Sequence, residues 1–348
     1  MNYIKVLNIV AIIIATILNS CGNQSHYFGD SLKVYDYKEV NHSMELSGTP
    51  IIKEAIGAYS INVVDTIICL ANHKTDLLFS LYNINGDSIV SIGRYGKGPS
   101  DFINNRMNRQ NTIVNDNAGM WVVDVNAAAL KHLSLTKSIR ARESCVDSII
   151  AIRPMVKNAY IAGDTILQEI INEGNFNISL STVKGESFFE ESLYKYTVNP
   201  SELFTFYDGS MGVSPDGSYL VSALSSINQV NILDLRTGRR RAVSVGGVKE
   251  PDDVLNRESM VPLRTYYSNL SLGDKYIYAL YEDQPYINQD SENKKSVLHI
   301  IDYDGNIVSI IPLDRFLYSI SYSEKNNSIY GLDDNETVWK YNLSETDL

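Results

Sequence analysis

A short motif, a turn carrying Asp or Asn followed by an apolar strand, recurs six times along this chain of 348 residues. The copies are Val64–Ile68, Asn117–Trp121, Gly163–Leu167, Pro215–Tyr219, Gly273–Ile277 and Asn326–Tyr330. Their Asp or Asn residues stand at positions 65, 117, 164, 216, 274 and 327, a spacing of about 52 residues. Four short strands with their turns fill such a unit, which is the content of one β-propeller blade.

Hairpin patterns follow the motif inside the repeats. The clearest is Ile300–Leu313, where apolar residues flank Asp304-Gly305, because a type I′ turn needs positive φ at both central residues. Weaker copies are Leu81–Gly93 and Ile232–Gly246. The strand that opens a unit precedes the motif, as in Ala58–Asn62, Gly209–Val213 and Phe316–Ser321. No amphipathic helical pattern of ten or more residues follows residue 20, which argues against α/β repeats.

The two ends of the repeat region are complementary. The last unit stops at Tyr341-Asn342-Leu343, with little room for a fourth strand, while Leu32–Tyr37 alternates and precedes the first unit. A closed ring removes exposed sheet edges. We therefore predict an all-β fold over residues 32–348: a six-bladed propeller of four-stranded antiparallel blades, closed when Leu32–Tyr37 completes the last blade.

The N-terminal 20 residues read as a signal peptide, with Lys5 before the apolar stretch Val6–Leu18. The following Leu18-Asn19-Ser20-Cys21-Gly22 resembles a bacterial lipobox, although Asn19 departs from its usual small or apolar residue. This resemblance implies a diacylglycerol thioether on Cys21, cleavage before it and acylation of the new N-terminus, for example by palmitate. The alternative is a plain secretory signal.

Residues 21–31 then form a polar tether. It lacks the acidic cluster that resembles a surface-export tag, so we expect a cell-envelope protein anchored in the outer membrane and facing the periplasm.

Composition narrows the classes of partner. The formal charge is −11, and the densest basic run is Arg239-Arg240-Arg241 beside a turn. Because an acidic surface repels phosphate backbones, we expect no nucleic-acid partner. Cys69 and Cys145 are either two thiols or a disulfide, and the spacing of the repeats favours the thiols. We expect a monomer.

Two segments resemble known propeller families. Val213-Ser214-Pro215-Asp216-Gly217 resembles the S-P-D-G turn of TolB-like propellers. Ile92–Phe102 resembles the G-x-G-x-G-P-x-E-F inter-blade loop of NHL-type propellers and of six-bladed propeller lipoproteins from Bacteroides-like bacteria, with Asp101 where Glu is commoner. The resemblance extends from about residue 32 to the end. It implies a fold shared by binding proteins and enzymes.

Strand order assigns each loop to a face. In an up-and-down blade, the loops between second and third strands and the connections between blades share one face, here called the upper face. The turns between the first and second strands and between the third and fourth strands form the lower face. Most polar clusters fall on upper-face segments, so we expect the ligand there. The candidate ligand-binding residues are His73, Arg94, Tyr95, Lys97, Arg257 and Tyr286.

The reasons differ among these residues. Arg94, Tyr95 and Lys97 lie in a glycine-rich loop that could hold an anion, or whose glycines only let the chain turn between blades. Arg257 and Tyr286 lie in the two longest upper-face segments, Gly246–Arg264 and Glu282–Lys295. Both segments belong to the fifth blade, and we predict that they form one wall of the site, the alternative being a solvated fringe.

A second candidate is a Ca²⁺ site at the channel mouth, with oxygen ligands from Glu173, Asn175, Asp283 and Asp334. The alternative is that these are solvated loop residues. Of the five His residues only His73 lies on the upper face, and neither G-x-S-x-G nor H-E-x-x-H is present. We therefore expect a non-catalytic envelope protein that binds a protein or glycan, with no cofactor besides that Ca²⁺. The rival is a metal-dependent propeller hydrolase or lyase.

The lipobox is directly testable. Replacing Cys21→Ser removes the thiol that would carry the diacylglycerol, so the protein should leave the membrane fraction without detergent. Fractionation and metabolic labelling with a palmitate analogue measure this. A variant that partitions with membranes like the wild type would contradict the assignment.

Overall fold

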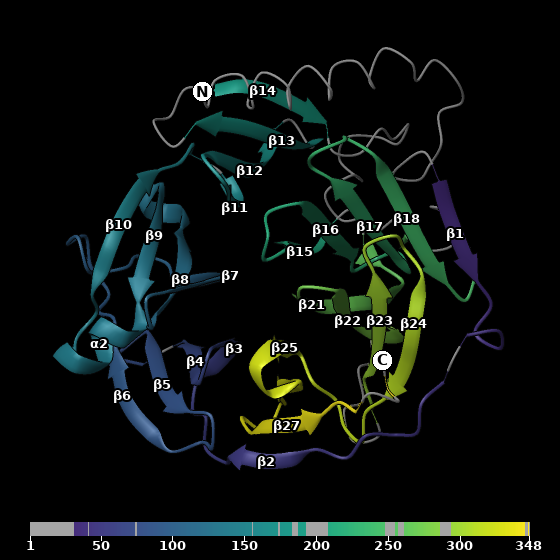
Figure 1. Cartoon of the computed structure of the whole chain (residues 1–348), viewed down its shortest axis with the longest axis horizontal. Helices are drawn as coiled ribbons and strands as arrows, with labels where there is room; N and C mark the ends of the chain where they lie inside the picture. The colour runs from purple at the N-terminus through teal and green to yellow at the C-terminus, as the bar shows by residue number, and fades with distance from the viewer. Residues whose placement is uncertain are drawn as a thin grey trace.

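The computed structural model describes residues 31–40, 42–73, 75–154, 156–172, 175–182, 187–192, 208–247, 255–256, 261–285, 294–344 and 347. Within them, six sheets of at least four strands are arranged around a central axis (Figure 1). The six-bladed propeller predicted from the repeats is therefore confirmed.

Each blade runs outward from its innermost strand. Blade 1 holds β3 (Ala58–Val64), β4 (Ile67–Asn72), β5 (Phe79–Asn83) and β6 (Ser88–Ile92). Blade 2 holds β7 (Arg106–Val114), β8 (Asn117–Asp124), β9 (Ala129–Ser134) and β10 (Val146–Ala151), with the 3-10 turn η1 (Val125–Ala127) and helix α2 (Leu135–Ala141) between strands. Blade 3 holds β11 (Val156–Ala162), β12 (Thr165–Asn172), β13 (Asn175–Thr182) and β14 (Ser187–Ser192).

The second half repeats the plan. Blade 4 holds β15 (Gly209–Val213), β16 (Tyr219–Leu224), β17 (Gln229–Asp234) and β18 (Arg240–Val245). Blade 5 holds β21 (Arg264–Leu272), β22 (Tyr276–Pro285), β23 (Val297–Asp302) and β24 (Ile307–Pro312). Blade 6 holds β25 (Ser319–Ser323), η3 (Glu324–Asn326), β26 (Ser328–Leu332) and β27 (Val338–Asn342). All six predicted motifs lie at the turn from the first to the second strand.

The apolar core lies between neighbouring blades. Between blades 1 and 2, for example, Phe79 packs in one buried cluster with Met120 and Leu133. Between blades 5 and 6, Leu298 shares a buried cluster with Tyr341. Burying such side chains is worth about 1.5–3 kcal/mol each, so the blades stabilise one another rather than folding separately.

The innermost strands are joined by polar side chains. The Asn269 Oδ1 of β21 accepts a hydrogen bond from Ile320 N of β25 at 3.2 Å, and Ser319 Oγ of β25 accepts from Ile61 N of β3 at 3.2 Å. Gln110 Oε1 of β7 accepts from Ile161 N of β11 at 2.7 Å. An inner strand has a sheet partner on one side only, so these bonds satisfy backbone groups that would otherwise be unpaired.

Arg109 crosses the centre of the ring. It stands at a bulge in β7 with φ of +59°. Its guanidinium donates to Leu270 O at 2.9 Å in blade 5, to Ser319 Oγ at 3.0 Å in blade 6 and to Ser60 Oγ in blade 1. Burial lowers its pKa to about 10. One side chain from blade 2 thus ties three other blades together.

The ring is closed by β2 (Thr49–Ile52), which pairs antiparallel with β27 as the outermost strand of blade 6. Closure by an N-terminal strand agrees with the sequence, but the assignment of Leu32–Tyr37 to this role is wrong. That segment overlaps β1 (Ser31–Tyr35), which pairs parallel with β18 and adds a fifth strand to blade 4 (Figure 1).

Side chains of β1 and of the residues just after it explain the position of this strand. Lys33 Nζ donates to Asp304 O and Asn306 Oδ1 in the turn of blade 5, at 2.9 and 2.7 Å. Tyr37 OH lies 3.2 Å from Nε2 of His299, whose other ring nitrogen contacts Tyr267 OH at 3.1 Å. Burial lowers the pKa of His299 to about 3, so this imidazole is a neutral packing group. The N-terminal segment thus runs along the outside of blades 4 and 5 before β2 closes blade 6.

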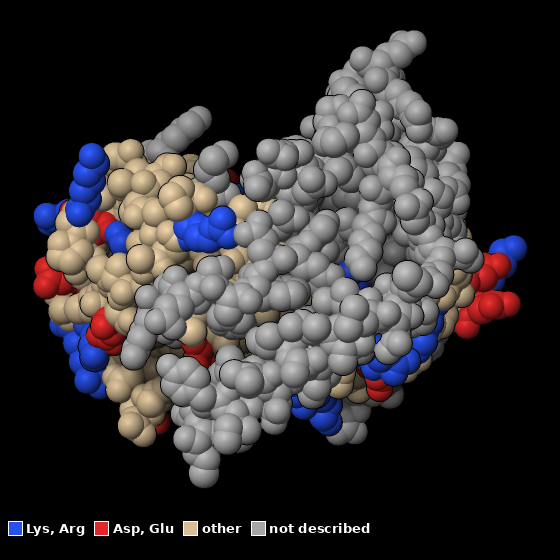
Figure 2. Space-filling model, turned by 90° about the horizontal axis from the view of Figure 1, so that it is seen from above, with Lys and Arg blue, Asp and Glu red and all other residues tan. Residues whose placement is uncertain are grey.

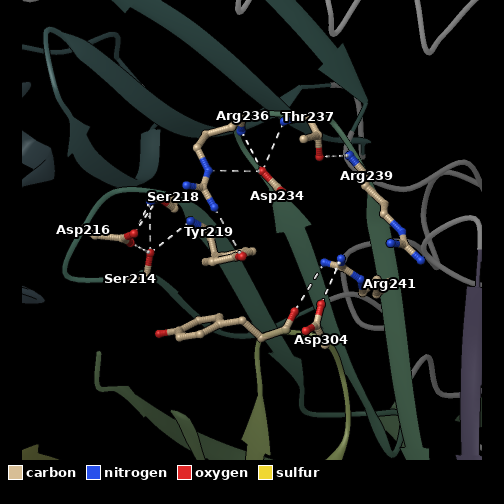
Figure 3. A network of polar contacts seen from close by, with 11 residues as sticks. Ser214, Asp216, Ser218, Tyr219, Asp234, Arg236, Thr237, Arg239, Arg241 and Asp304 are labelled. Atoms are coloured by element: carbon tan, nitrogen blue, oxygen red, sulfur yellow. Dashed lines mark hydrogen bonds and ion pairs between the residues drawn. The ribbon is translucent and has the colours of Figure 1, made fainter. Parts of the chain in front are cut away.

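The S-P-D-G turn that resembles TolB-like propellers is tightly bonded (Figure 3). The Asp216 carboxylate accepts bonds from Ser218 N at 3.0 Å, Ser218 Oγ at 2.6 Å and Ser214 Oγ at 2.7 Å. Burial alone would raise the pKa of Asp216, but these bonds outweigh it and lower the pKa. The motif therefore serves to shape the β15–β16 turn.

Three further expectations concern the cysteines, the N-terminal segment and the surface charge. Cys69 and Cys145 are free thiols, Cys69 being buried. The signal peptide and Cys21 lie outside the described residues, and within the described part no helix is long and apolar enough to cross a membrane. Figure 2 shows cations and anions interspersed on the described surface that it displays.

Two truncations separate the roles of β1 and β2. A chain beginning at Ser47 keeps β2 and should fold with a lowered melting temperature, because it loses the Lys33 and Tyr37 contacts. A chain beginning at Glu54 also exposes the edge of β27 and should aggregate or unfold without a cooperative transition. Thermal melts and size-exclusion chromatography compare them; equal melting temperatures would contradict closure by β2.

Candidate ligand-binding surface

The glycine-rich connection between blades 1 and 2, residues 93–102, folds back on itself. Phe102 N donates to Arg94 O at 3.0 Å, and Gly96 N donates to Phe102 O at 3.2 Å. Tyr95 and Phe102 form an isolated parallel bridge. The loop is therefore a closed, hydrogen-bonded unit.

The glycines leave room for Asp101. Gly98 N donates to Asp101 Oδ2 at 3.0 Å, and a Cβ on either Gly96 or Gly98 would lie 2.6 Å from that oxygen. Gly93 has a φ of +82°, which favours glycine. These contacts give the glycines a structural role in packing the loop around Asp101.

A buried ion pair fixes the base of the loop to blade 2. Lys131 Nζ lies 2.9 Å from Asp124 Oδ2, and both residues are buried. Asp124 also accepts from Ile103 N and Asn104 N, at 3.1 and 2.9 Å, while Lys131 Nζ donates to Asp101 O at 2.6 Å. Loop and blade are thus held by charge-assisted bonds in a site that excludes water.

Above this base the loop presents a cationic and aromatic surface. The Tyr95 side chain is 73% exposed, and Arg94 and Lys97 on either side of it are also exposed. The three predicted ligand residues of this loop are therefore accessible on a rigid support.

His73 lies in the neighbouring loop of blade 1 and stacks on Tyr59, with ring centroids 3.6 Å apart. Tyr59 OH donates to Asn105 O and Oδ1 at 3.0 and 2.9 Å. Asn105 Nδ2 in turn donates to the backbone oxygen of Asn72, the residue before His73, at 3.1 Å. Burial raises the pKa of Tyr59 to about 12. Asn105 thus joins the loop of His73 to the chain that follows the glycine-rich loop, which brings these predicted residues into one sector.

The three predicted Ca²⁺ ligands that the structure describes are distributed over blades 3, 5 and 6. Glu173 lies outside the described residues, and Asn175 begins β13 opposite Asn172. The Asp283 carboxylate accepts a bond from Arg264 Nε at 2.6 Å, and Asp334 lies in the turn before β27. Across the described ranges, no cluster of three His, Cys, Asp or Glu side chains could hold a metal.

Arg257 and Tyr286 also lie outside the described residues, so their predicted positions stay predictions. The bases of their two segments are adjacent, because Arg264 pairs with Pro285 in the β21–β22 ladder. The first segment includes a small ladder, β19 (Leu255–Asn256) with β20 (Val261–Pro262). The first segment therefore enters blade 5 beside the place where the second leaves it.

Sequence reasoning missed the Asp124–Lys131 pair and Arg109. It also missed the contacts of His132 with Thr112 and Asp147. The available signal was polar residues set among apolar ones in a predicted strand, as at Lys131 and His132 between Leu130 and Leu133. Such a residue has to find a partner when it is buried.

Comparisons with known proteins agree with the architecture. A family profile described as TolB-like 6-blade propeller-like matches residues 55–325. A search of curated proteins finds no significant match. The chain is similar to the crystal structure of a member of the DUF4221 family from Bacteroides vulgatus, with a TM-score of 0.55 at 11% identity, covering 87% of this chain and 97% of that one. It is also similar to a putative exported protein from Bacteroides fragilis, with a TM-score of 0.55 at 8% identity, covering 89% and 98%.

The buried pair allows a stability test. Lys131→Met leaves the Asp124 carboxylate buried without its cation and should lower the free energy of unfolding by about 3 kcal/mol. Lys137→Met is the matched control, because its pair with Asp147 is exposed and should contribute less than about 1 kcal/mol. Urea unfolding measures both; equal losses would show that the loop is not fixed by this pair.

Proposed function

Because the chain belongs to the TolB-like six-bladed propeller family, a fold that serves both binding proteins and enzymes, we propose that it is an envelope-anchored binding protein. It binds a protein or glycan ligand through its upper face and carries no catalytic site there. The lipobox-like sequence at Cys21 supports the anchor. The similar structure named as an exported protein supports a location outside the cytoplasm.

The observation that carries this proposal is the exposed Tyr95 on the braced loop of residues 93–102. Tyr and Arg dominate the energetics of protein interfaces because they offer large contact areas and hydrogen bonds. A loop already held by Asp101 and the Asp124–Lys131 pair loses little conformational entropy on binding. Exposed aromatic and cationic side chains on rigid backbone are what a binding surface requires.

The form and charge of this surface favour a protein as the ligand. Tyr95 projects from the surface, which suits insertion into a partner's pocket. Arg94 and Lys97 favour an acidic patch on the partner, because opposite charges steer association. The rival metal-dependent enzyme gains no support from Asp283, whose carboxylate is engaged by Arg264.

Site-directed photo-crosslinking in the native host tests this function. A benzophenone amino acid at position 95 should yield a discrete adduct, and the same probe at Met44, which is 88% exposed, is the matched control. Reversing the flanking charges with Arg94→Glu and Lys97→Glu should abolish the adduct at position 95. Protease treatment then separates a protein ligand from a glycan.

Adducts of equal yield at positions 95 and 44 would contradict a specific surface. An adduct that survives the double charge reversal would contradict recognition by the cationic loop.

A further inference from the structure

A cavity of about 510 Å³ lies on the face opposite the proposed binding surface. Its wall includes the β7–β8 turn and the end of β9 near α2, which belong to the lower face of blade 2, and Ile161 of blade 3 lines it from the other side. Its size is within the range of small-molecule sites. Nothing in the proposed function uses it.

The cavity occurs where apolar packing between blades 2 and 3 ends. Val123, Leu130 and Ile150 of blade 2 pack with Val156 and Ala159 of blade 3 in a buried cluster. Towards the lower face the lining stays mostly apolar, with Val114, Ile150 and Ile161, but several polar side chains of blade 2 join it. They include Thr112, Trp121, His132, Ser134, Asp147 and Ser148.

Gly119 allows the side chains of His132 and Thr112 to meet. The His132 ring of β9 lies across Gly119 of β8, where a Cβ would be only 2.7 Å from its Cε1 and Nε2 atoms. His132 Nε2 therefore reaches Thr112 Oγ1 of β7, at 2.6 Å. Trp121, directly opposite His132 in the ladder, contacts the same ring edge-on at a centroid distance of 5.0 Å.

The charges around the cavity balance. Asp147 Oδ1 accepts from Lys137 Nζ at 2.8 Å, and Asp147 Oδ2 lies 3.9 Å from His132 Nδ1. Burial lowers the pKa of His132, while Asp147 acts to raise it and Lys137 to lower it, so the imidazole is neutral at pH 7. One ammonium and one carboxylate are left, and they are paired with each other.

We propose that this cavity binds an uncharged polyhydroxylated ring, such as one sugar unit of a glycan. Trp121 and Ile161 offer contact to the apolar face of the ring, and Thr112, Ser148 and Asp147 offer donors and acceptors to its hydroxyls.

Other ligand classes fit the cavity less well. An anion would meet Asp147, and a cation would meet Lys137. A wholly apolar ligand would strip water from Ser148 and from the Asp147 Oδ2 atom without replacing those hydrogen bonds. The order Thr112, His132, Asp147 is also that of a nucleophile, base and acid, but Asp147 lies nearer to Lys137 than to His132. The arrangement therefore suits recognition rather than proton transfer.

Intrinsic fluorescence gives a selective measurement. The chain has two Trp residues, and Trp339 lies in blade 6, stacked under Arg315 and bonded to Asp333. Trp339→Phe therefore leaves Trp121 as the sole reporter. In this background, at least one of methyl glucoside, methyl galactoside, methyl mannoside and N-acetylglucosamine should change the Trp121 emission saturably, with a Kd of about 1 mM or lower.

Variants distinguish this cavity from other sites. Thr112→Val and Asp147→Ala should each weaken binding of the responding sugar about tenfold, because each removes hydrogen bonds to the ring. Gly119→Ala should have a comparable effect by displacing His132. Tyr95→Ala, on the opposite face, is the control and should leave the Kd unchanged. Circular dichroism confirms that each variant is folded.

Three outcomes would overturn the proposal. The first is no saturable response to any of the four sugars. The second is a Kd that is unaffected by Thr112→Val and Asp147→Ala in folded protein. The third is tighter binding of a uronic acid than of the matching neutral sugar, because the proposed site has no unpaired cation.

Discussion

The unpaired edge of the innermost strand is the constraint on which the ring depends. In each blade the innermost strand has one row of backbone groups without a sheet partner. Side chains of neighbouring blades satisfy part of this row. The backbone N–H groups of Ile161, Ile320 and Ile61 donate to side-chain oxygens of Gln110, Asn269 and Ser319, respectively. Because the side chain and its backbone partner belong to different blades, these hydrogen bonds fix the position of one blade relative to the next. Arg109 extends the same principle across the axis by donating to blades 5 and 6.

This rigid ring accounts for two surfaces of different character. On the upper face, a loop that would be free in isolation is fastened to blade 2 by Asp124 and Lys131, so its exposed Tyr95 is held in place. On the lower face, apolar packing between blades 2 and 3 stops short and leaves a cavity with a balanced set of polar groups. The first surface projects and suits a macromolecule, whereas the second is concave and suits a small ring. Both depend on neighbouring blades being held in one relative position.

Much of the fold could be predicted from local patterns, and the exceptions share a cause. Turns such as Asp304-Gly305 need residues that tolerate positive φ, and Gly305 has a φ of +79°. The strand that closes the ring was missed because it has four residues, one of them Pro50, a composition typical of an edge strand. Leu32–Tyr37 does contain a strand, but its pairing with β18 depends on Lys33 and Tyr37 meeting blade 5. For the candidate site, the sequence could indicate the upper-face loops but not which side chains stay exposed.

The sequence by itself determined the number of blades and most of the turns that join their strands, because these follow from alternation and backbone preferences over a few residues. Only the tertiary structure decided which sheet edges pair and which polar side chains meet. Thr112, His132 and Asp147 stand on three different strands, and His132 reaches Thr112 because Gly119 on the strand between them carries no side chain. Contacts of that kind depend on the register of several strands at once, and no local pattern in a single chain encodes them.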